Sequence, residues 1–231
     1  QSCAGPMMTL NTIVAEAFDS LAEELSSFAP ETFLAQLQET LKRRISEHKR
    51  IIFNGDNYSE EWVKEAERRG LPNLKNTMTA LHTLVNEKNV ALFEKYGVFS
   101  RRELESRFEI FLEEYHRRIR IEGRLSWEMA ATIILPALRN EYKQTVSALS
   151  RALDAKRTNG TAALQKLADK LGGALDSVVS DLDTLETALT SCHEDILAAM
   201  SRLRTSVDAA ETLVNDRSWP LPKYREMLFI Y

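Results

Sequence analysis

The sequence predicts a mainly α-helical protein. We expect a helical bundle with a long, coiled-coil-like antiparallel hairpin, and a C-terminal tail that is a short strand or extended. Apolar residues recur at three- and four-residue steps through most of the chain, which is typical of amphipathic helices. The 231 residues include only 8 glycines and 6 prolines, too few for a loop-rich β-sandwich. A seven-residue apolar repeat in the second half indicates the hairpin.

The composition narrows the classes of partner and compartment. The 30 basic and 34 acidic residues give a net charge of −4, which provides no bulk attraction for nucleic acid or an anionic membrane. No apolar run reaches the roughly 18 residues that span a bilayer. Two cysteines cannot build a disulfide framework, so we expect a cytoplasmic protein. No signal-peptide pattern occurs at the start. Because the chain starts at Gln1, which is not an initiator methionine, we expect a fragment of a longer protein.

The first hundred residues predict several helices. The first runs from about Thr9 to Ser26 and the second from Pro30 to about His48, with Pro30 in a first turn that does not need its N–H. Their apolar faces comprise Leu10, Ile13, Val14, Ala17, Phe18, Leu21 and Leu25 in the first helix, and Phe33, Leu34, Leu37, Leu41 and Ile45 in the second.

A turn follows these two helices. The apolar triplet Ile51–Phe53 is compatible with a short strand, and Asn54–Asn57 predicts a turn. Ser59 is a candidate N-cap for a helix that ends at Arg69, with Gly70 at the position after its end. Two short helices are expected at 76–84 and 86–96, the second closed by Gly97.

Ser100 and Glu103 form a capping box, which predicts the start of a helix that runs to about Ile121. We expect Gly123 to interrupt it, because glycine inside a helix costs about 1 kcal/mol relative to alanine. The pattern restarts at Ser126 and continues to about Arg157, with a kink at Pro136.

The segment after the Asn159-Gly160 turn carries the clearest period. One heptad series comprises Ala168, Leu175, Leu182, Leu189, Ile196, Leu203 and Ala210, and its companion Leu164, Leu171, Val178, Leu185, Cys192, Ala199, Ser206 and Leu213. Together they predict an a/d seam in a helix packed antiparallel to the preceding helix; uninterrupted, Thr161–Val214 would be roughly 80 Å long. A bend at Gly172-Gly173 or a restart capped by Ser191 would break this arm and allow a four-helix bundle.

The C-terminal segment from Trp219 to Tyr231 breaks the helical pattern with two prolines and ends in apolar strand formers. Such a tail is unfavourable in water, so we expect it to dock in a groove of its own chain or of a neighbour. The candidate docking residues are Trp219, Pro220, Leu221, Pro222, Tyr224, Met227, Leu228 and Phe229.

The sequence offers no catalytic or metal-binding constellation. None of the four histidines has a partner at metal-ligand spacing, and the common phosphate-loop, dinucleotide and nucleophile motifs are missing. Cys192 falls on the seam and is interpreted as a packing residue. The turn Asn54–Asn57 could hold a cation, but it lacks the further carboxylates of a calcium loop, so a capping turn is favoured.

One basic cluster allows two interpretations. Arg117, Arg118, Arg120 and Arg124 could clamp a phosphate. They also follow a run of glutamates spaced for pairing four residues apart, at the end of a helix where cations are stabilised, and this interpretation is favoured. From the residues alone, an interaction or assembly module is therefore favoured over an enzyme.

Four stretches of the chain resemble the C-terminal part of type III glutamine synthetase, the long-chain bacterial class. They are Gln1–Pro6 leading into Leu10–Ala17, Lys88–Val98, Trp219–Phe229 and, most specifically, Lys49–Leu74, which reads KRIIFNGDNYSEEWVKEAERRGLPNL. The resemblance implies that residues 1–99 are the terminal helical part of the catalytic domain. Residues 100–231 would then be a class-specific helical hairpin or bundle with the docking tail.

The resemblance also implies what the parent protein does. Such enzymes join glutamate and ammonia with ATP and Mg²⁺ or Mn²⁺, and they assemble as homo-oligomers of stacked hexameric rings. The family's Glu-Phe-Arg strand does not occur in this chain, so no catalytic, cofactor-binding or metal-binding residue is assigned here. We expect a catalytically silent, structural C-terminal piece that binds neither nucleic acid nor membrane. The alternative is a stand-alone helical scaffold for protein interactions, without enzymatic activity.

Overall fold

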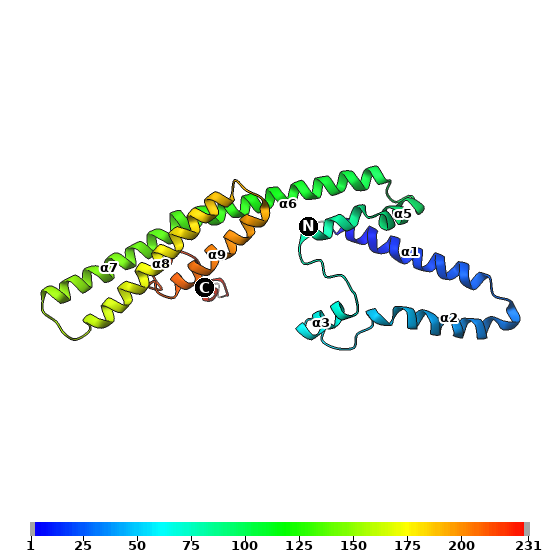
Figure 1. The fold of residues 1–231 in the computed structure, drawn as a ribbon, viewed down its shortest axis with the longest axis horizontal. Helices are drawn as coiled ribbons and strands as arrows, with labels where there is room; N and C mark the ends of the chain where they lie inside the picture. Colours follow the sequence, from blue (N-terminus) through cyan, green and yellow to red (C-terminus); the bar gives the residue numbers. More distant parts are fainter. Residues whose placement is uncertain (1–2, 229–231) are drawn as a thin grey trace. The chain divides into compact units, whose positions relative to one another are not determined.

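A computed structural model describes residues 3–228, and these residues form helices and irregular segments without a strand. The mainly α prediction is confirmed. The chain divides into two compact units, residues 1–113 and residues 114–231. The boundary between them falls inside helix α6 (Arg101–Met129). Figure 1 shows the helices of each unit. In the described part of the chain, no helix is long and apolar enough to cross a bilayer.

The first unit contains α1 (Ala4–Ser26), α2 (Phe33–His48), α3 (Glu60–Arg68), α4 (Thr77–Leu81) and α5 (Glu87–Lys95), and short 3-10 turns join them at Pro30–Thr32, Lys49–Ile51 and His82–Val85. Side-chain oxygens of Ser59, Asn76 and Asn86 accept a backbone N–H at the start of α3, α4 and α5. Gly70 and Gly97 have positive φ after α3 and α5. These caps confirm the sequence-based boundaries.

The expected short strand at Ile51–Phe53 is wrong. Lys49–Ile51 continues α2 as a 3-10 turn, and Ile52 is extended without a strand partner in the described chain. The physical reason lies in the Phe53 ring, which stacks on Trp62 of α3 at 4.3 Å between centroids, whereas Ile51 and Ile52 stay exposed. The buried core of this unit is small and lies around Val90, Phe93 and Leu104.

Helix α6 starts at the predicted capping box. The Ser100 N–H donates to Glu103 Oε2 at 2.8 Å, and the Glu103 N–H donates to Ser100 Oγ at 3.4 Å. The predicted interruption at Gly123 is wrong, because α6 continues without a break to Met129. Gly123 is buried, and a Cβ built on it would lie 2.7 Å from Ile196 Cγ2 of α9 (His193–Glu211). A close helix crossing, rather than a break, therefore explains this glycine.

The helix passes Pro136 through a π-helical segment. Ala130–Ile134 is π-helical, and α7 (Leu135–Asp154) follows directly with Pro136 in its first turn. Because proline lacks the N–H that an α-turn needs, a wide turn just before it lets the helix continue. The distortion that we expected in the helix at Pro136 is thus a π-helical segment just before the proline.

The antiparallel hairpin is confirmed. α7 ends at Asp154, Gly160 has a φ of +85°, and α8 (Thr161–Ala188) returns along α7, as Figure 1 shows in green and yellow. Of the two breaks considered for the second arm, the one near Ser191 occurs, since residues 189–192 form a corner and α9 packs back on α8. The break ends at Cys192, which is the N-cap of α9 in place of Ser191 and makes no side-chain cap hydrogen bond, and α8 continues through Gly172-Gly173.

The heptad seam forms the core of the second unit. Leu171, Val178, Leu185 and Ile196 have no exposed surface, and Ala168, Leu182, Ala199, Leu203 and Ala210 are also buried. Cys192 is an exception, because the corner removes it from the seam and leaves its thiol exposed. The packing role predicted for Cys192 is therefore wrong.

Candidate functional site

The start of the C-terminal tail is anchored in the core of the second unit. The Trp219 side chain is 7% exposed and belongs to the buried cluster, and Leu221 packs half-buried against the same cluster. The Trp219 N–H donates to Asn215 O at 3.1 Å, and the Asn215 N–H donates to Glu141 Oε2 of α7 at 3.4 Å. Lys223 forms an ion pair with Asp216. These contacts hold the segment before the last helix on its own unit.

The end of the tail is helical and exposed. Pro220 and Pro222 are exposed, and Tyr224 opens the short helix α10 (Tyr224–Leu228). The Met227 side chain is largely exposed and that of Leu228 is 72% exposed, so neither residue forms the expected strand. Phe229 lies outside the described residues. Of the candidate docking residues whose side chains the structure describes, Trp219 is buried and Leu221 is half-buried.

Helix α1 contacts its own unit through its polar side. Lys95 Nζ donates to Glu16 Oε2 at 2.7 Å, and the Tyr96 hydroxyl contacts Glu16 Oε2 at 2.7 Å and Asp19 Oδ2 at 2.9 Å. Thr12, one turn earlier on the same side, is buried and donates to Met8 O. α1 thus packs beside α5 through carboxylates and a hydroxyl.

The opposite side of α1 is apolar and uncovered. At 100° per residue, Leu10, Val14 and Phe18 lie roughly opposite Thr12, Glu16 and Asp19. Leu10, Ile13 and Val14 are about half exposed, and Phe18 is 69% exposed. The sequence predicted these residues on one face, and the described chain leaves that face largely exposed. We call Leu10, Ile13, Val14 and Phe18 the α1 apolar face.

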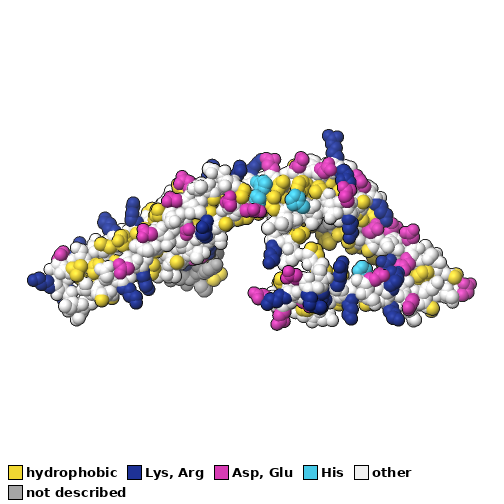
Figure 2. Space-filling model, viewed as in Figure 1, with side chains coloured by type: hydrophobic (Ala, Val, Ile, Leu, Met, Phe, Trp, Pro, Cys, Tyr) yellow, Lys and Arg dark blue, Asp and Glu magenta, His cyan; other side chains and the backbone are white. Residues whose placement is uncertain are grey.

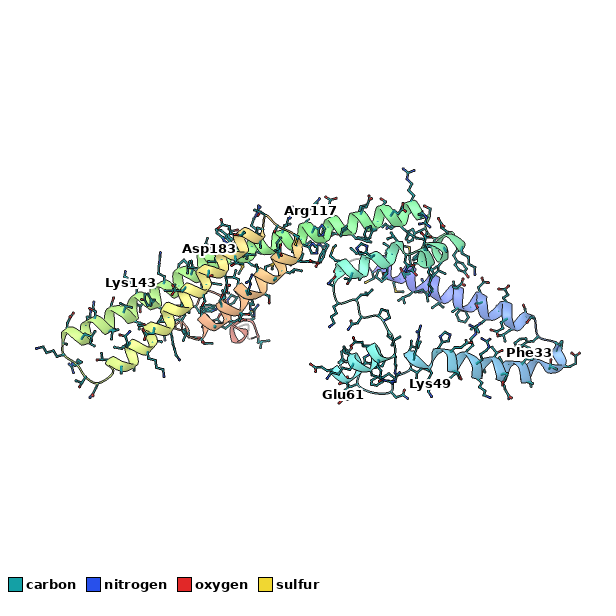
Figure 3. The ribbon with its side chains drawn as sticks, in the orientation of Figure 1. Phe33, Lys49, Glu61, Arg117, Lys143 and Asp183 are labelled. Atoms are coloured by element: carbon teal, nitrogen blue, oxygen red, sulfur yellow. The ribbon has the colours of Figure 1, made fainter. Side chains whose placement is uncertain are left out.

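Helix α2 has the same arrangement. Glu24 of α1 pairs with Arg43 and with Arg44, the latter at 2.7 Å, and Thr40 donates to Glu24 Oε1 at 3.4 Å. The apolar residues of α2 remain exposed at Leu34, Leu41 and Ile45. Figure 2 shows hydrophobic side chains among charged ones on the visible surface, and Figure 3 marks α2 by Phe33 and Lys49 at its ends. Two neighbouring helices therefore meet through polar groups.

Residues 50–69 form a compact clamp around Arg69. Its guanidinium lies 5.6 Å from the Trp62 ring and 6.0 Å from the Phe53 ring, and Nη1 donates to Ile52 O at 2.9 Å. A Cβ at Gly55 would lie 2.4 Å from Phe53 Cζ, so the turn packs under this ring. The clamp presents Tyr58 to solvent with 99% of its surface exposed.

The predicted turn Asn54–Asn57 is a capping turn. Asp56 Oδ1 accepts the Tyr58 N–H at 2.9 Å, and Asp56 O accepts the Ser59 N–H at 3.2 Å, which places Ser59 at the start of α3. In the described part of the chain, no three His, Cys, Asp or Glu side chains lie close enough to hold a metal ion.

Ion pairs set the charge states of several carboxylates. Hydrogen bonds from Arg68 and then Arg69 lower the pKa of Glu65 from 4.5 to about 2. Hydrogen bonds from Lys95 and Tyr96 lower the pKa of Glu16. Desolvation and the hydrogen bond to Glu16 raise the pKa of Tyr96 to about 12. The two carboxylates therefore stay ionised and Tyr96 stays neutral near neutral pH, and their hydrogen bonds are structural contacts.

One residue of the arginine cluster forms the intrahelical ion pair that the helix-stabilising interpretation predicts. Arg118 pairs with Glu114 one helical turn earlier on α6, and Figure 3 labels Arg117 on the same helix. Such exposed pairs stabilise a helix by a few tenths of a kcal/mol. Anion binding by Arg117, Arg118, Arg120 and Arg124 stays an alternative prediction.

Sequence reasoning missed three features. It did not show that the α1 apolar face is exposed, because periodicity identifies a face but not what covers it. It missed the clamp around Arg69, because Phe53, Trp62 and Arg69 are not regularly spaced in the sequence. It also missed the stacking of His116 on His193, which lie far apart in the sequence and meet only because α9 folds back.

Comparison with known proteins gives consistent matches. Residues 36–155 match the family model of the glutamine synthetase C-terminal domain. The chain is 30% identical to the type-3 glutamine synthetase of Dictyostelium discoideum over 97% of its own length and 33% of that protein. It is 33% identical to a glutamine synthetase of Butyrivibrio fibrisolvens over 91% of its length and 32% of the relative. The chain thus spans about a third of the length of these curated relatives.

Proposed function

This chain belongs to the glutamine synthetase family, and we propose that it serves as the C-terminal region of an ATP-dependent glutamate–ammonia ligase. In this proposal the chain has a structural and assembly role in the enzyme and supplies no catalytic group. Residues 1–99 complete the catalytic domain, and residues 100–231 form the class-specific helical extension. The parent enzyme works in the cytoplasm.

The α1 apolar face carries this proposal. Its four large side chains are about half exposed or more, whereas the polar side of the same helix is held by Lys95 and Tyr96. Large apolar patches on a folded protein mark surfaces that a partner covers. The two thirds of the relatives' length that this chain does not span supply such a partner within the same polypeptide.

The chemistry belongs to the rest of the parent enzyme. There, ATP transfers its γ-phosphoryl group to the glutamate γ-carboxylate, and ammonia then displaces phosphate, with Mg²⁺ or Mn²⁺ stabilising the phosphoryl oxygens. The carboxylates described above do not fit that metal, because Glu16, Asp19, Glu24 and Glu65 are each held by a Lys, Arg or Tyr side chain. We therefore assign no step of the reaction to this chain.

The proposal includes assembly as a homo-oligomer, without nucleic acid or membrane. The exposed end of α10 and the exposed faces of α1 and α2 are available for contacts inside such an assembly. Their side chains are mainly aliphatic and aromatic, the composition of buried interface cores.

A glutamine-formation assay tests the proposal. The 231-residue chain and the full-length gene product are compared with glutamate, ammonia, ATP and Mg²⁺ at equal subunit concentration. We expect glutamine from the full-length protein and none above the blank from the chain. Turnover by the chain alone would refute its silent role. A full-length product without activity would favour the stand-alone helical scaffold instead.

A further inference from the structure

A pair of stacked imidazoles joins the start of α9 to α6. The rings of His116 on α6 and His193, the first residue of α9, lie 4.6 Å apart between centroids with an interplanar angle of 28°. The Tyr115 ring meets His193 edge-on at 5.7 Å. Both histidines belong to the second unit, so this contact lies inside one compact body.

The pair has few polar groups around it that could hold added protons. His116 Nε2 is buried and has no hydrogen-bond partner among the described residues. A protonated His116 would carry an N–H there without an acceptor, and two stacked imidazolium ions would repel each other at close range. His193 also sits at the N-terminus of α9, where the helix dipole disfavours positive charge.

The charged groups near the pair do not compensate for a second proton. From α9, Glu194 Oε1 lies 4.0 Å from His193 Nε2, but the Glu194 side chain is 79% exposed and screened by water. Asp195, also in the first turn of α9, accepts from the Cys192 thiol at 3.3 Å. Along α6, Glu113 and Arg120 stand one turn on either side of His116, with opposite charges.

The α8–α9 corner lies next to Gly123 of α6. Residues 189–192 leave the helices, and Cys192 provides no side-chain cap for α9. Ile196 and the half-buried Leu189 approach α6 at Gly123, where the missing Cβ makes room for them. The histidine stack lies beside this crossing, at the first residue of α9, where it adds a ring contact between α9 and α6.

We propose that His116 and His193 form a pH-sensitive latch, which holds the α8–α9 corner on α6 when both rings are neutral and releases it when they gain protons. Histidine side chains as a class change charge in the range of pH 5 to 8. Release frees the first turn of α9, while the α7–α8 hairpin stays folded because its seam contains no titratable group of this kind.

Hydrogen exchange of the 231-residue chain, corrected for the intrinsic effect of pH, tests the latch. On moving from about pH 7.5 to about pH 5.5, we expect corrected exchange in residues 189–200 to rise about tenfold or more, with little change in residues 163–185. The variants His116→Phe and His193→Phe keep an aromatic ring that cannot titrate, and we expect them to lose this pH response. His48→Gln, at the exposed end of α2, is the matched control that keeps it.

Two results would overturn the latch. One is equal corrected exchange of residues 189–200 at both pH values in the unmodified chain. The other is a full pH response that persists in His193→Phe, whose side chain lies at the edge of the core and whose replacement is the milder of the two. If His116→Phe fails to fold, His193→Phe alone decides the outcome.

Discussion

Gly123 of α6 and Ile196 of α9 approach so closely that a Cβ on the glycine would lie 2.7 Å from Ile196 Cγ2. Leu189 Cδ2 would lie 3.0 Å from the same added atom. Both neighbours are apolar side chains, and Ile196 is fully buried, so neither can easily move away. The close crossing of α6 and α9 therefore requires glycine at this position.

This crossing predicts opposite effects for two glycine substitutions. Gly123→Ala gains about 1 kcal/mol of helix propensity but overpacks the crossing by about 1–3 kcal/mol, so we expect net destabilisation of the second unit. Gly173→Ala is the matched control inside α8, where an added Cβ meets nothing within 4 Å, and it should stabilise by about 0.5–1 kcal/mol. Urea unfolding of both variants measures the difference. Equal stabilisation by the two substitutions would contradict the crossing.

The anchoring of the tail predicts a large effect at Trp219 and a small one nearby. Trp219→Ala should destabilise the second unit by about 3–5 kcal/mol, because it leaves a cavity in the buried cluster. Leu228→Ala removes an exposed side chain in the same tail and should change stability by less than about 0.5 kcal/mol. Thermal unfolding followed by circular dichroism compares them. A small loss for Trp219→Ala would show that the tail does not contribute to the core.

The Arg69 clamp predicts a local effect in residues 50–58. Arg69→Met removes the donor to the Arg50 and Ile52 carbonyls and the cation beside Phe53 and Trp62. We expect faster protease cleavage and faster amide exchange in this segment. Arg68→Met is the control, because Arg68 pairs with the same Glu65 carboxylate from a largely exposed position. Similar cleavage of both variants would show that Arg69 does not hold the segment.

The pKa of Glu65 gives the clamp a defined pH dependence. The two arginines lower this pKa from 4.5 to about 2 in the folded state, so the ion pairs stabilise the segment above about pH 4.5. Their contribution is lost as the pH falls from about 4.5 towards about 2. A carboxyl ¹³C titration should show the Glu65 midpoint near the lower value, and Arg69→Met should raise it. A midpoint near 4.5 in the unmodified chain would argue against the pairs.

Local chemistry made much of the fold predictable. Ser59, Ser100 and Gly70 act through residues close in sequence, so the sequence identifies the helix ends that they form. The heptad seam likewise predicts which residues of α8 and α9 are buried. The sequence offered the fold-back near Ser191 only as one of two possible breaks, because the heptad continues through it and the choice depends on how α9 packs against α6 and α8.

The candidate docking surfaces were harder to predict. The apolar period of α1 identifies one face, but whether a core or another part of the protein covers it depends on residues far away. Lys95 and Tyr96, which hold the polar side of α1, lie about eighty residues downstream of Glu16 and carry no local signal that they bind it.

Thiol labelling on the α1 apolar face tests the central claim most directly, namely that another part of the parent enzyme covers this face. Ile13→Cys is introduced after Cys3 and Cys192, both exposed, are replaced by serine. We expect rapid labelling in the 231-residue chain and labelling at least about tenfold slower in the full-length gene product. Equally rapid labelling in both proteins would contradict the claim, because it would leave the α1 apolar face uncovered in the whole enzyme.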